Sequence, residues 1–219
     1  DEIEKKKKVL CEGAQGTMLD VDHGTYPFVT SSNSTSGGAS TGLGIPPTQI
    51  DRVVGVIKAY TTRVGEGPFP TELNDEDGER LRDEGREFGS TTGRPRRCGW
   101  FDAVVARYAI RLNGIDAMAI TKLDVLDRFN TLRVCTGYKY KGKVFEEMPA
   151  DLDILENGEP VYTQFEGWNQ STVKAEKFDQ LPDNAKQYID GLQNILGIGF
   201  LMISTGPERN QTIRQGALF

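Results

Sequence analysis

A chain of 219 residues, of which 37% are hydrophobic, is long enough to bury the core of one α/β domain, so we expect it to fold. Its formal net charge of −6 argues against a broad nucleic-acid-binding surface, because affinity for phosphate backbones comes mainly from clustered lysine and arginine. The four lysines at residues 5–8 are interpreted as a solvated flank, in preference to a nucleic-acid or membrane contact.

The cysteines and the single histidine restrict the chemistry. Cys11, Cys98 and Cys135 are odd in number and widely spaced, which does not fit a disulfide framework and indicates a reducing compartment. With no recognisable signal peptide and no apolar run long enough to cross a bilayer, a soluble cytoplasmic protein without membrane contact is expected. His23 has no partners at the spacing of a zinc site or a Ser-His-Asp triad, so we expect it to have a structural hydrogen-bonding role.

The N-terminal segment is predicted to contain a buried strand and a polar loop. Residues 9–11 are apolar and end at the glycine-containing residues 12–17, which predicts a strand opening into a tight loop. Residues 31–44, rich in serine and glycine, look like a flexible linker. Apolar residues before them and prolines after them favour instead a loop held at both ends and facing a ligand.

A helix and a strand are predicted next. Pro46 and Pro47 suit the start of a helix, and Thr48 is its expected N-cap. The residues that follow at the spacing of one helical face are Ile50, Val53, Val54 and Ile57. Residues 60–64 then predict a strand, closed by the turn-rich residues 65–70.

Helices and strands alternate in the second half of the chain. Residues 75–87 predict a charged, solvent-exposed helix. Residues 103–112 predict another helix, with Gly114 just beyond its end, and residues 116–121 an apolar strand.

The C-terminal region continues this pattern. Residues 132–145 predict a hairpin that turns near Gly142. One apolar helical face, ended by Gly197, is formed by Ala185, Ile189, Leu192, Ile195 and Leu196. Residues 200–203 then predict a strand that ends at the polar residues 204–207.

Strands that alternate with amphipathic helices indicate an α/β fold with a mainly parallel central sheet flanked by helices on both faces. Apolar strands open into polar or glycine-rich loops near Gly13, Lys122 and Ser204. Ligands collect along the carboxyl edge of such sheets, so we expect the site there.

The segment Thr121-Lys122-Leu123-Asp124 suits the recognition of guanine. Only guanine presents adjacent N1–H and N2–H₂ donors, and the carboxylate of Asp124 can accept both. The stem of Lys122 can lie against the base while its ammonium stays near water or a ribose oxygen. A loop such as Ser204-Thr205-Gly206-Pro207 can close over the base, because Gly206 allows close approach. A structural salt bridge at the strand end is the alternative.

Residues 91–97, called the arginine loop below, concentrate three guanidinium groups between Gly89 and Gly99. Arg94 and Arg96 project to a similar side in an extended segment, where planar guanidinium groups suit carboxylates and phosphates. The alternatives are an ordinary basic surface loop or ion pairs with the acidic residues 75–87.

No stretch matches the phosphate-binding pattern G-x-x-x-x-G-K-[ST], so the predicted nucleotide site lacks a cradle for the β- and γ-phosphates. This makes the site incomplete.

Several ordered motifs together resemble adenylosuccinate synthetase. They are Glu12-Gly-Ala-Gln-Gly-Thr17, His23-Gly-Thr-Tyr-Pro27, Val29-Thr-Ser-Ser-Asn33, Pro68-Phe-Pro-Thr-Glu72, Thr91-Thr-Gly-Arg-Pro-Arg-Arg-Cys-Gly-Trp100, Thr121-Lys-Leu-Asp-Val-Leu-Asp127 and Ser204-Thr-Gly-Pro207. The resemblance runs from Val9 to the C-terminus and covers about the C-terminal half of such an enzyme. It implies a P-loop NTPase-like fold, with residues 1–219 as the C-terminal portion of a single domain.

Members of that family join inosine monophosphate (IMP) to L-aspartate with GTP and Mg²⁺ in AMP biosynthesis. GTP first phosphorylates the 6-oxygen of IMP, and the aspartate amine then displaces this phosphate. The protein therefore mainly positions three anionic ligands and stabilises developing charge.

The resemblance also implies the site residues. Those for IMP are Gln15, Thr30, Val64 and Arg94. Those for aspartate are Ser90, Thr91, Thr92, Gly93, Arg94 and Arg96. Those for GTP are Arg96, Lys122, Leu123, Asp124, Ser204, Thr205 and Gly206.

The family's phosphate loop, its aspartate base and magnesium ligand, and its catalytic histidine belong to the N-terminal half. We therefore expect no catalytic residue and no metal ligand in this chain, and His23 does not replace that histidine. The chain alone is expected to be inactive, and the full-length protein is expected to be a homodimer that binds no nucleic acid.

Two other functions compete with the enzyme. A noncatalytic guanine-nucleotide-binding module derived from it would need neither Gln15 nor the arginine loop, yet both are present. A regulatory GTPase would explain Lys122 and Asp124 but not Arg94 and Arg96.

Overall fold

The computed structural model describes residues 2–89 and 93–217. The parallel core of its main sheet is built from three strands in the order β1-β5-β9, with β10 antiparallel to β9 at one edge. These strands are β1 (Val54–Lys58), β5 (Ala117–Thr121), β9 (Phe200–Ser204) and β10 (Thr212–Arg214). The expected α/β fold with a mainly parallel central sheet is confirmed.

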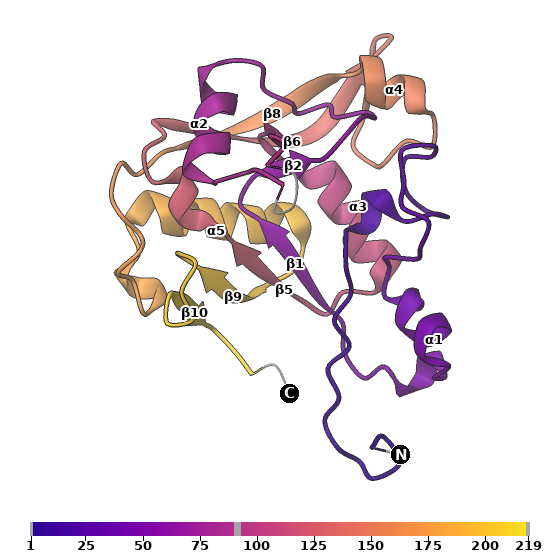
Figure 1. The fold of residues 1–219 in the computed structure, drawn as a ribbon. Helices are drawn as coiled ribbons and strands as arrows, with labels where there is room; N and C mark the ends of the chain where they lie inside the picture. The colour runs from indigo at the N-terminus through magenta and orange to yellow at the C-terminus, as the bar shows by residue number, and fades with distance from the viewer. Residues whose placement is uncertain (1, 90–92, 218–219) are drawn as a thin grey trace.

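Two smaller sheets extend the structure beyond the end of the main sheet (Figure 1). The first pairs β2 (Thr61–Arg63) with β3 (Arg97–Gly99) in antiparallel register. The second is built around β6 (Thr131–Tyr140), which pairs with β4 (Phe101–Asp102), β7 (Lys143–Phe145) and β8 (Glu159–Glu166). The hairpin expected at residues 132–145 is therefore confirmed as β6 and β7.

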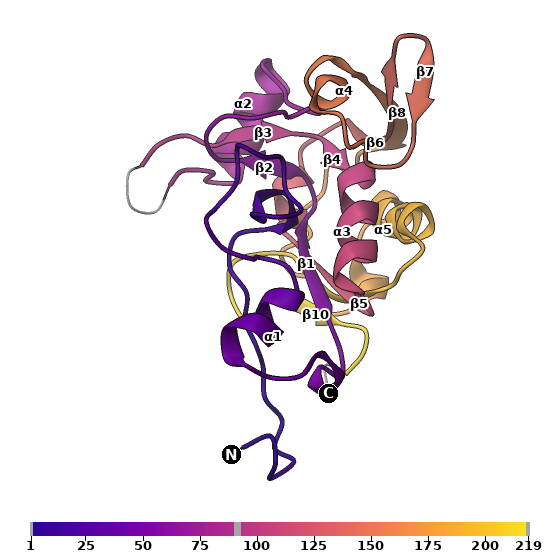
Figure 2. The same ribbon diagram turned by 90° about the vertical axis from the view of Figure 1, so that its right-hand side faces the viewer.

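The two longest helices lie on one face of the main sheet. They are α3 (Ala103–Asn113) and α5 (Asp183–Leu196), and Figure 2 shows both on the same side of β1 and β5, with α1 (Gly37–Leu43) and the N-terminal segment on the other. Gly114 and Gly197 cap α3 and α5 in the left-handed conformation, at φ 58° and 68°. The sequence thus placed both helix ends correctly.

Shorter helices complete the chain. They are α2 (Glu76–Glu84), α4 (Leu152–Asn157), and the 3₁₀ turns η1 (Thr17–Leu19), η2 (Pro47–Gln49), η3 (Leu123–Leu126) and η4 (Phe178–Gln180). The side chain of Asp75 accepts a hydrogen bond from the backbone N–H of Gly78 and caps α2. The charged helix expected within residues 75–87 is therefore present as α2. No helix among the described residues is long and apolar enough to cross a membrane.

Three local predictions near the N-terminus were wrong. Val9 and Leu10 are 45% and 69% exposed and belong to no strand, because no described strand pairs with residues 9–11. Residues 31–44 are not a loop throughout, since α1 forms within them. The helix predicted from Thr48 is replaced by β1, whose pairing with β5 outweighs the helical spacing of its apolar residues.

The main core fills the space between the sheet and the two long helices. Its fully buried members include Ile120 of β5, Leu123 of η3, and Tyr188, Ile189 and Leu192 of α5. The hydroxyl of Tyr188 donates to the carbonyl of Ala59 at 3.0 Å, so its buried polar atom is satisfied. This packing fixes the carboxyl edge of the main sheet, where the predicted site begins.

Candidate functional site

The ends of β5 and β9 lie side by side. Ile120 pairs with Ile203 in parallel register, so Lys122 and Ser204 both follow at the carboxyl edge of the sheet. Two of the three loops expected at one edge are therefore adjacent. The third, near Gly13, leaves no strand of this sheet.

Lys122 directly precedes η3 and has a left-handed backbone conformation, with φ 60°. Its ammonium donates to the carbonyl of Gly85 at 2.5 Å and to Oε1 of Glu87 at 2.9 Å. This ammonium was expected near water or a ribose oxygen, whereas the structure pairs it with a buried carboxylate. The salt-bridge alternative is therefore realised for the ammonium of Lys122, while the aliphatic part of its side chain can still lie against a base.

Asp124 carries an acceptor atom without a donor. Its Oδ1 is buried and has no hydrogen-bond partner among the described residues. Burial raises the pKa of Asp124, and the nearby Asp127 raises it further. A buried acceptor left unpaired is costly, so Asp124 is suited to receive N–H donors from a ligand.

A pocket of about 360 Å³ opens beside Asp124. Its other lining residues come from α2, from η3 and from two loops and are Glu84, Val125, Asp127, Arg128, Asn169, Gln170, Ser171 and Val173. A planar base that docks against Asp124 would therefore find space next to the carboxylate.

The loop after β9 is held by its own hydrogen bonds. Ser204 Oγ donates to the carbonyl of Gly206 at 2.9 Å, and the backbone N–H of Thr205 donates to the carbonyl of Gln211 at 2.9 Å. A Cβ atom on Gly206 would lie 2.3 Å from Oε1 of Gln211. The lack of a side chain at Gly206 thus serves the packing of Gln211, a reason that the sequence did not reveal.

The base of the arginine loop is a short antiparallel bridge. The backbone N–H of Arg96 donates to the carbonyl of Glu87 at 2.9 Å, and that of Gly89 to the carbonyl of Arg94 at 2.8 Å. Gly93 continues the loop at φ 65° and donates to the carbonyl of Gly89 at 2.8 Å. The remaining predicted aspartate-binding residues, Ser90, Thr91 and Thr92, lie outside the described residues.

The three arginines of this loop have different surroundings. Arg94 is exposed. Arg96 donates to Oε2 of Glu87 at 2.7 Å, so the alternative of an ion pair with residues 75–87 is realised for this arginine. Nε of Arg96 is buried without a partner among the described residues, so its N–H is a donor that a ligand can satisfy.

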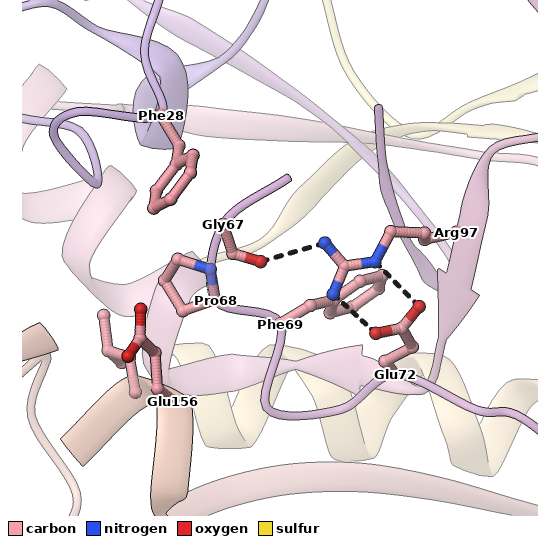
Figure 3. Close-up of a pocket in the computed structure, with 8 residues that line it drawn as sticks. Phe28, Gly67, Pro68, Phe69, Glu72, Arg97 and Glu156 are labelled. Carbon is pink, nitrogen blue, oxygen red and sulfur yellow. Dashed lines mark hydrogen bonds and ion pairs between the residues drawn. The ribbon is translucent and has the colours of Figure 1, made fainter. Parts of the chain in front are cut away.

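Arg97 holds a neighbouring loop in place, as Figure 3 shows. It forms a two-pronged ion pair with Glu72, at 2.7 and 2.5 Å, and donates to the carbonyl of Gly67 at 2.9 Å. The pocket beside it has a volume of about 310 Å³ and is lined by Phe28, Gly67, Pro68, Phe69, Glu72, Arg97, Leu155 and Glu156. With its guanidinium occupied, Arg97 has a structural role next to Arg96.

Glu87 connects the two predicted parts of the site and was missed by sequence reasoning. Its carboxylate is fully buried and accepts hydrogen bonds from Lys58 at 2.8 Å and Tyr60 at 2.6 Å, besides those from Lys122 and Arg96. These five residues are called the Glu87 cluster below. Burial raises the pKa of Glu87, but the bonds from Lys58, Tyr60 and Lys122 outweigh it and lower the pKa to about 2.

No pattern in the sequence distinguished Glu87 from its exposed acidic neighbours, since residues 75–87 were predicted to form one solvated helix. The helix ends at Glu84, and the chain then turns inward at Gly85. A Cβ atom on Gly85 would lie 2.2 Å from the hydroxyl of Tyr60, so glycine is required there for Tyr60 to reach Glu87.

The N-terminal loop is organised by Asp20. This buried carboxylate accepts hydrogen bonds from the backbone N–H groups of Asp22, His23, Ser34 and Thr35. Burial raises the pKa of Asp20, but the four donors outweigh it, and the net pKa lies below its usual value. The side chain of His23 is exposed, whereas its backbone N–H donates to Asp20 and its carbonyl accepts from the hydroxyl of Tyr108 at 2.9 Å.

Three of the four predicted IMP residues come from two connected segments, and the fourth, Arg94, lies in the arginine loop. The backbone N–H of Thr30 donates to the carbonyl of Leu19 at 2.7 Å, and the hydroxyl of Thr30 lies 3.4 Å from that of Ser32. Gln15 is exposed near the start of the same segment at φ 61°. Val64, 59% exposed, directly follows β2.

Arg63 ties these segments together. Its guanidinium donates to Thr25 at 2.9 Å and to the carbonyl of Phe28 at 3.2 Å. Arg63 also pairs with Arg97 in the β2-β3 ladder, which places Val64 one step beyond the ladder beside Arg96. The structure therefore links the N-terminal loop, Val64 and the arginine loop.

Cys98 and Cys135 are buried and Cys11 is exposed, and all three are free thiols. In the part of the chain that the structure describes, no group of three or more His, Cys, Asp or Glu side chains is placed to hold a metal ion.

Comparison with known proteins identifies the family. The sequence model described as adenylosuccinate synthetase matches residues 1–213. The adenylosuccinate synthetase of Trichlorobacter lovleyi is 59% identical over 207 residues, which are 94% of this chain and 48% of that protein. The Geotalea daltonii enzyme is 56% identical over 212 residues, covering 97% of this chain and 49% of its own length.

Solved structures agree. The fully ligated adenylosuccinate synthetase of Plasmodium falciparum superposes with a TM-score of 0.95 at 45% identity, over 98% of this chain and 52% of that one. A succinoaminodeoxyadenylate synthetase of cyanophage S-2L, solved with dGMP and dATP, gives a TM-score of 0.55 at 20% identity, over 94% of this chain and 46% of that one, and shows a shared fold alone. The chain spans about half the length of the curated relatives that it matches. It belongs to the adenylosuccinate synthetase family.

Proposed function

We propose that this chain forms the base-reading and aspartate-binding portion of an enzyme that joins IMP to L-aspartate with GTP. The observation that carries the proposal is the unpaired, buried Oδ1 of Asp124 at the edge where β5 and β9 end. A carboxylate there accepts the N1–H and N2–H₂ donors of guanine, a pair that adenine does not present.

The stem of Lys122 supports the face of the base, while Leu123 fixes η3 in the core. The loop Ser204-Thr205-Gly206 lies along the other side of the base. We assign GTP to these residues together with Arg96, as the family resemblance implies.

Aspartate and IMP occupy the arginine loop and the segments next to it. Arg96 and Arg94, with Ser90, Thr91, Thr92 and Gly93, bind the two carboxylates of aspartate, for which guanidinium groups are suited. Gln15, Thr30, Val64 and Arg94 contact IMP. The hydrogen bonds of Arg63 and the β2-β3 ladder, which bring Val64 next to Arg96, support this assignment.

In the reaction, the 6-oxygen of IMP takes the γ-phosphoryl group of GTP, and the amine of aspartate then displaces that phosphate. The products are adenylosuccinate, GDP and phosphate. The residues of this chain bind and orient the three substrates, and their cationic groups stabilise negative charge that develops during both steps.

The family depends on Mg²⁺. The described residues offer no cluster suited to a metal, so no step of the mechanism is assigned to a metal on this chain. We propose that the magnesium ligands, the phosphate loop and the catalytic base lie in the half of the family's length that these 219 residues do not span. A cytoplasmic homodimer stays a prediction from the resemblance, and sedimentation of the full-length protein tests its dimeric state.

The proposal is tested by chromatographic detection of adenylosuccinate made by the full-length protein. We expect formation only when GTP, IMP, aspartate and Mg²⁺ are all present, and no formation by the 219-residue chain alone. Equal activity with ATP in place of GTP would contradict the assignment of Asp124.

A further inference from the structure

Four donors from three parts of the fold meet on the carboxylate of Glu87. Lys58 ends β1, Tyr60 precedes β2, Lys122 follows β5, and Arg96 precedes β3. Oε1 accepts from the first three and Oε2 from Arg96. Lys58 and Tyr60 belong to one turn, so this side chain connects three segments, namely the β1–β2 turn, the end of β5 and the arginine loop.

The cluster keeps an excess of positive charge. The three cations Lys58, Lys122 and Arg96 surround one carboxylate, so two positive charges remain unbalanced within it. The side chains of these cations are 26%, 35% and 30% exposed, whereas that of Glu87 is 0% exposed. Glu87 thus holds the cations from the interior and leaves them accessible to anionic ligands.

The backbone around Glu87 strengthens this connection. Its carbonyl accepts the N–H of Arg96 at 2.9 Å, next to the bridge between Phe88 and Pro95. Two residues earlier, the carbonyl of Gly85 accepts the ammonium of Lys122 at 2.5 Å. A displacement of residues 85–87 would consequently move Lys122 and Arg96 together.

We propose that Glu87 is a positioning residue that couples the guanine-reading end of the site to the arginine loop. It holds Lys122 and Arg96 on the two oxygens of one buried carboxylate and so sets the geometry in which each meets its ligand. The inference rests on the proposed function, in which Lys122 contacts GTP and Arg96 contacts aspartate as well as GTP. It deepens that function by linking the binding of two substrates through a residue that touches neither.

The test is Glu87→Gln in the full-length protein. The amide keeps the size of the side chain, but it loses the charge and cannot accept hydrogen bonds at both ends. We expect the KM for GTP and the KM for aspartate to rise together, each on the order of tenfold, with the KM for IMP changed less than about threefold. If Glu87 had a purely structural role, the variant would have a lower melting temperature, but the KM values for GTP and aspartate would not rise in preference to the KM for IMP.

Two variants serve as controls. Glu79→Gln removes the same charge from an exposed position on α2, and it should change none of the three KM values. Tyr60→Phe removes the uncharged donor and keeps all three cations in place, so it should change the KM values for GTP and aspartate much less than Glu87→Gln does.

A rise in one of the two constants alone, or in neither, would overturn the coupling. If Glu87→Gln does not fold, Glu87→Asp is measured instead, because it keeps the charge and withdraws the carboxylate by one methylene. Unchanged KM values for GTP and aspartate in Glu87→Asp would then overturn the coupling. Absence of adenylosuccinate formation by the unmodified full-length protein would reject the proposed function itself, whereas an active protein with an unaffected Glu87→Gln variant would reject only the coupling.

Discussion

The ammonium of Lys122 and Oε1 of Glu87 lie 2.9 Å apart, although 35 positions separate them in the sequence. The contact brings the end of β5 against the segment that follows α2, and the same carboxylate binds Arg96 on its other oxygen. Two motifs that the sequence presented as separate candidates are therefore connected through one carboxylate.

Gly85→Ala should destabilise the protein. The new Cβ would lie 2.2 Å from the hydroxyl of Tyr60 and 2.5 Å from the carbonyl of Leu81, both in packed surroundings. Overpacking of this kind costs about 1–3 kcal/mol of the free energy of unfolding, measured by urea denaturation. Gly13→Ala is the matched control, since nothing lies within 4 Å of its new Cβ, and an equal loss in both variants would contradict the explanation.

Arg97→Lys should also destabilise the protein. A lysine cannot reproduce the two-pronged pair with Glu72 or reach the carbonyl of Gly67 in the same geometry. We expect a loss of about 1–3 kcal/mol in the free energy of unfolding. Arg111→Lys changes an exposed pair with Glu147 and should cost less than about 0.5 kcal/mol. Similar losses for both arginines would show that the Glu72 pair does not anchor the loop.

The buried Asp102 predicts a pH dependence of stability. Burial raises its pKa to about 6, against the opposing hydrogen bonds from Tyr138, Val105 and Val104. Because the folded state binds a proton more tightly than the unfolded state, the contribution of Asp102 to the free energy of unfolding grows as pH falls from about 7 to about 4.

Asp102→Asn lacks this titration. As pH falls over that range, the free energy of unfolding of the wild type should therefore rise relative to that of Asp102→Asn, by up to about 3 kcal/mol. Denaturation series at several pH values measure it, and a difference that does not vary with pH would refute the raised pKa.

The sequence predicted those elements whose local signals agree with their packing. The helices that end at Gly114 and Gly197 and the hairpin at Gly142 have both the expected periodicity and a glycine with positive φ. β1 was mistaken for a helix because Val53, Val54 and Ile57 satisfy a helical spacing, while its true partner, β5, lies about sixty residues away. Long-range pairing of this kind leaves no local trace.

The site shows the same division. Lys122, Asp124 and the arginine loop could be proposed as site residues because their residue types match the chemistry of guanine and of carboxylates. Glu87 could not, because a buried carboxylate and an exposed one are identical in sequence, and only the fold places Lys58 and Tyr60 around it. The contact between Gly206 and Gln211 was missed for the same reason.

The central claim, that Asp124 reads guanine, is tested most directly by the nucleotide preference of Asp124→Asn in the full-length protein. An amide presents one acceptor and one donor, so it no longer matches the two donors of guanine but can donate to the 2-oxygen of xanthine and accept from its N1–H. We predict that kcat/KM for GTP falls by at least about a hundredfold and that xanthosine triphosphate becomes the better substrate. An unchanged preference for GTP would contradict the account.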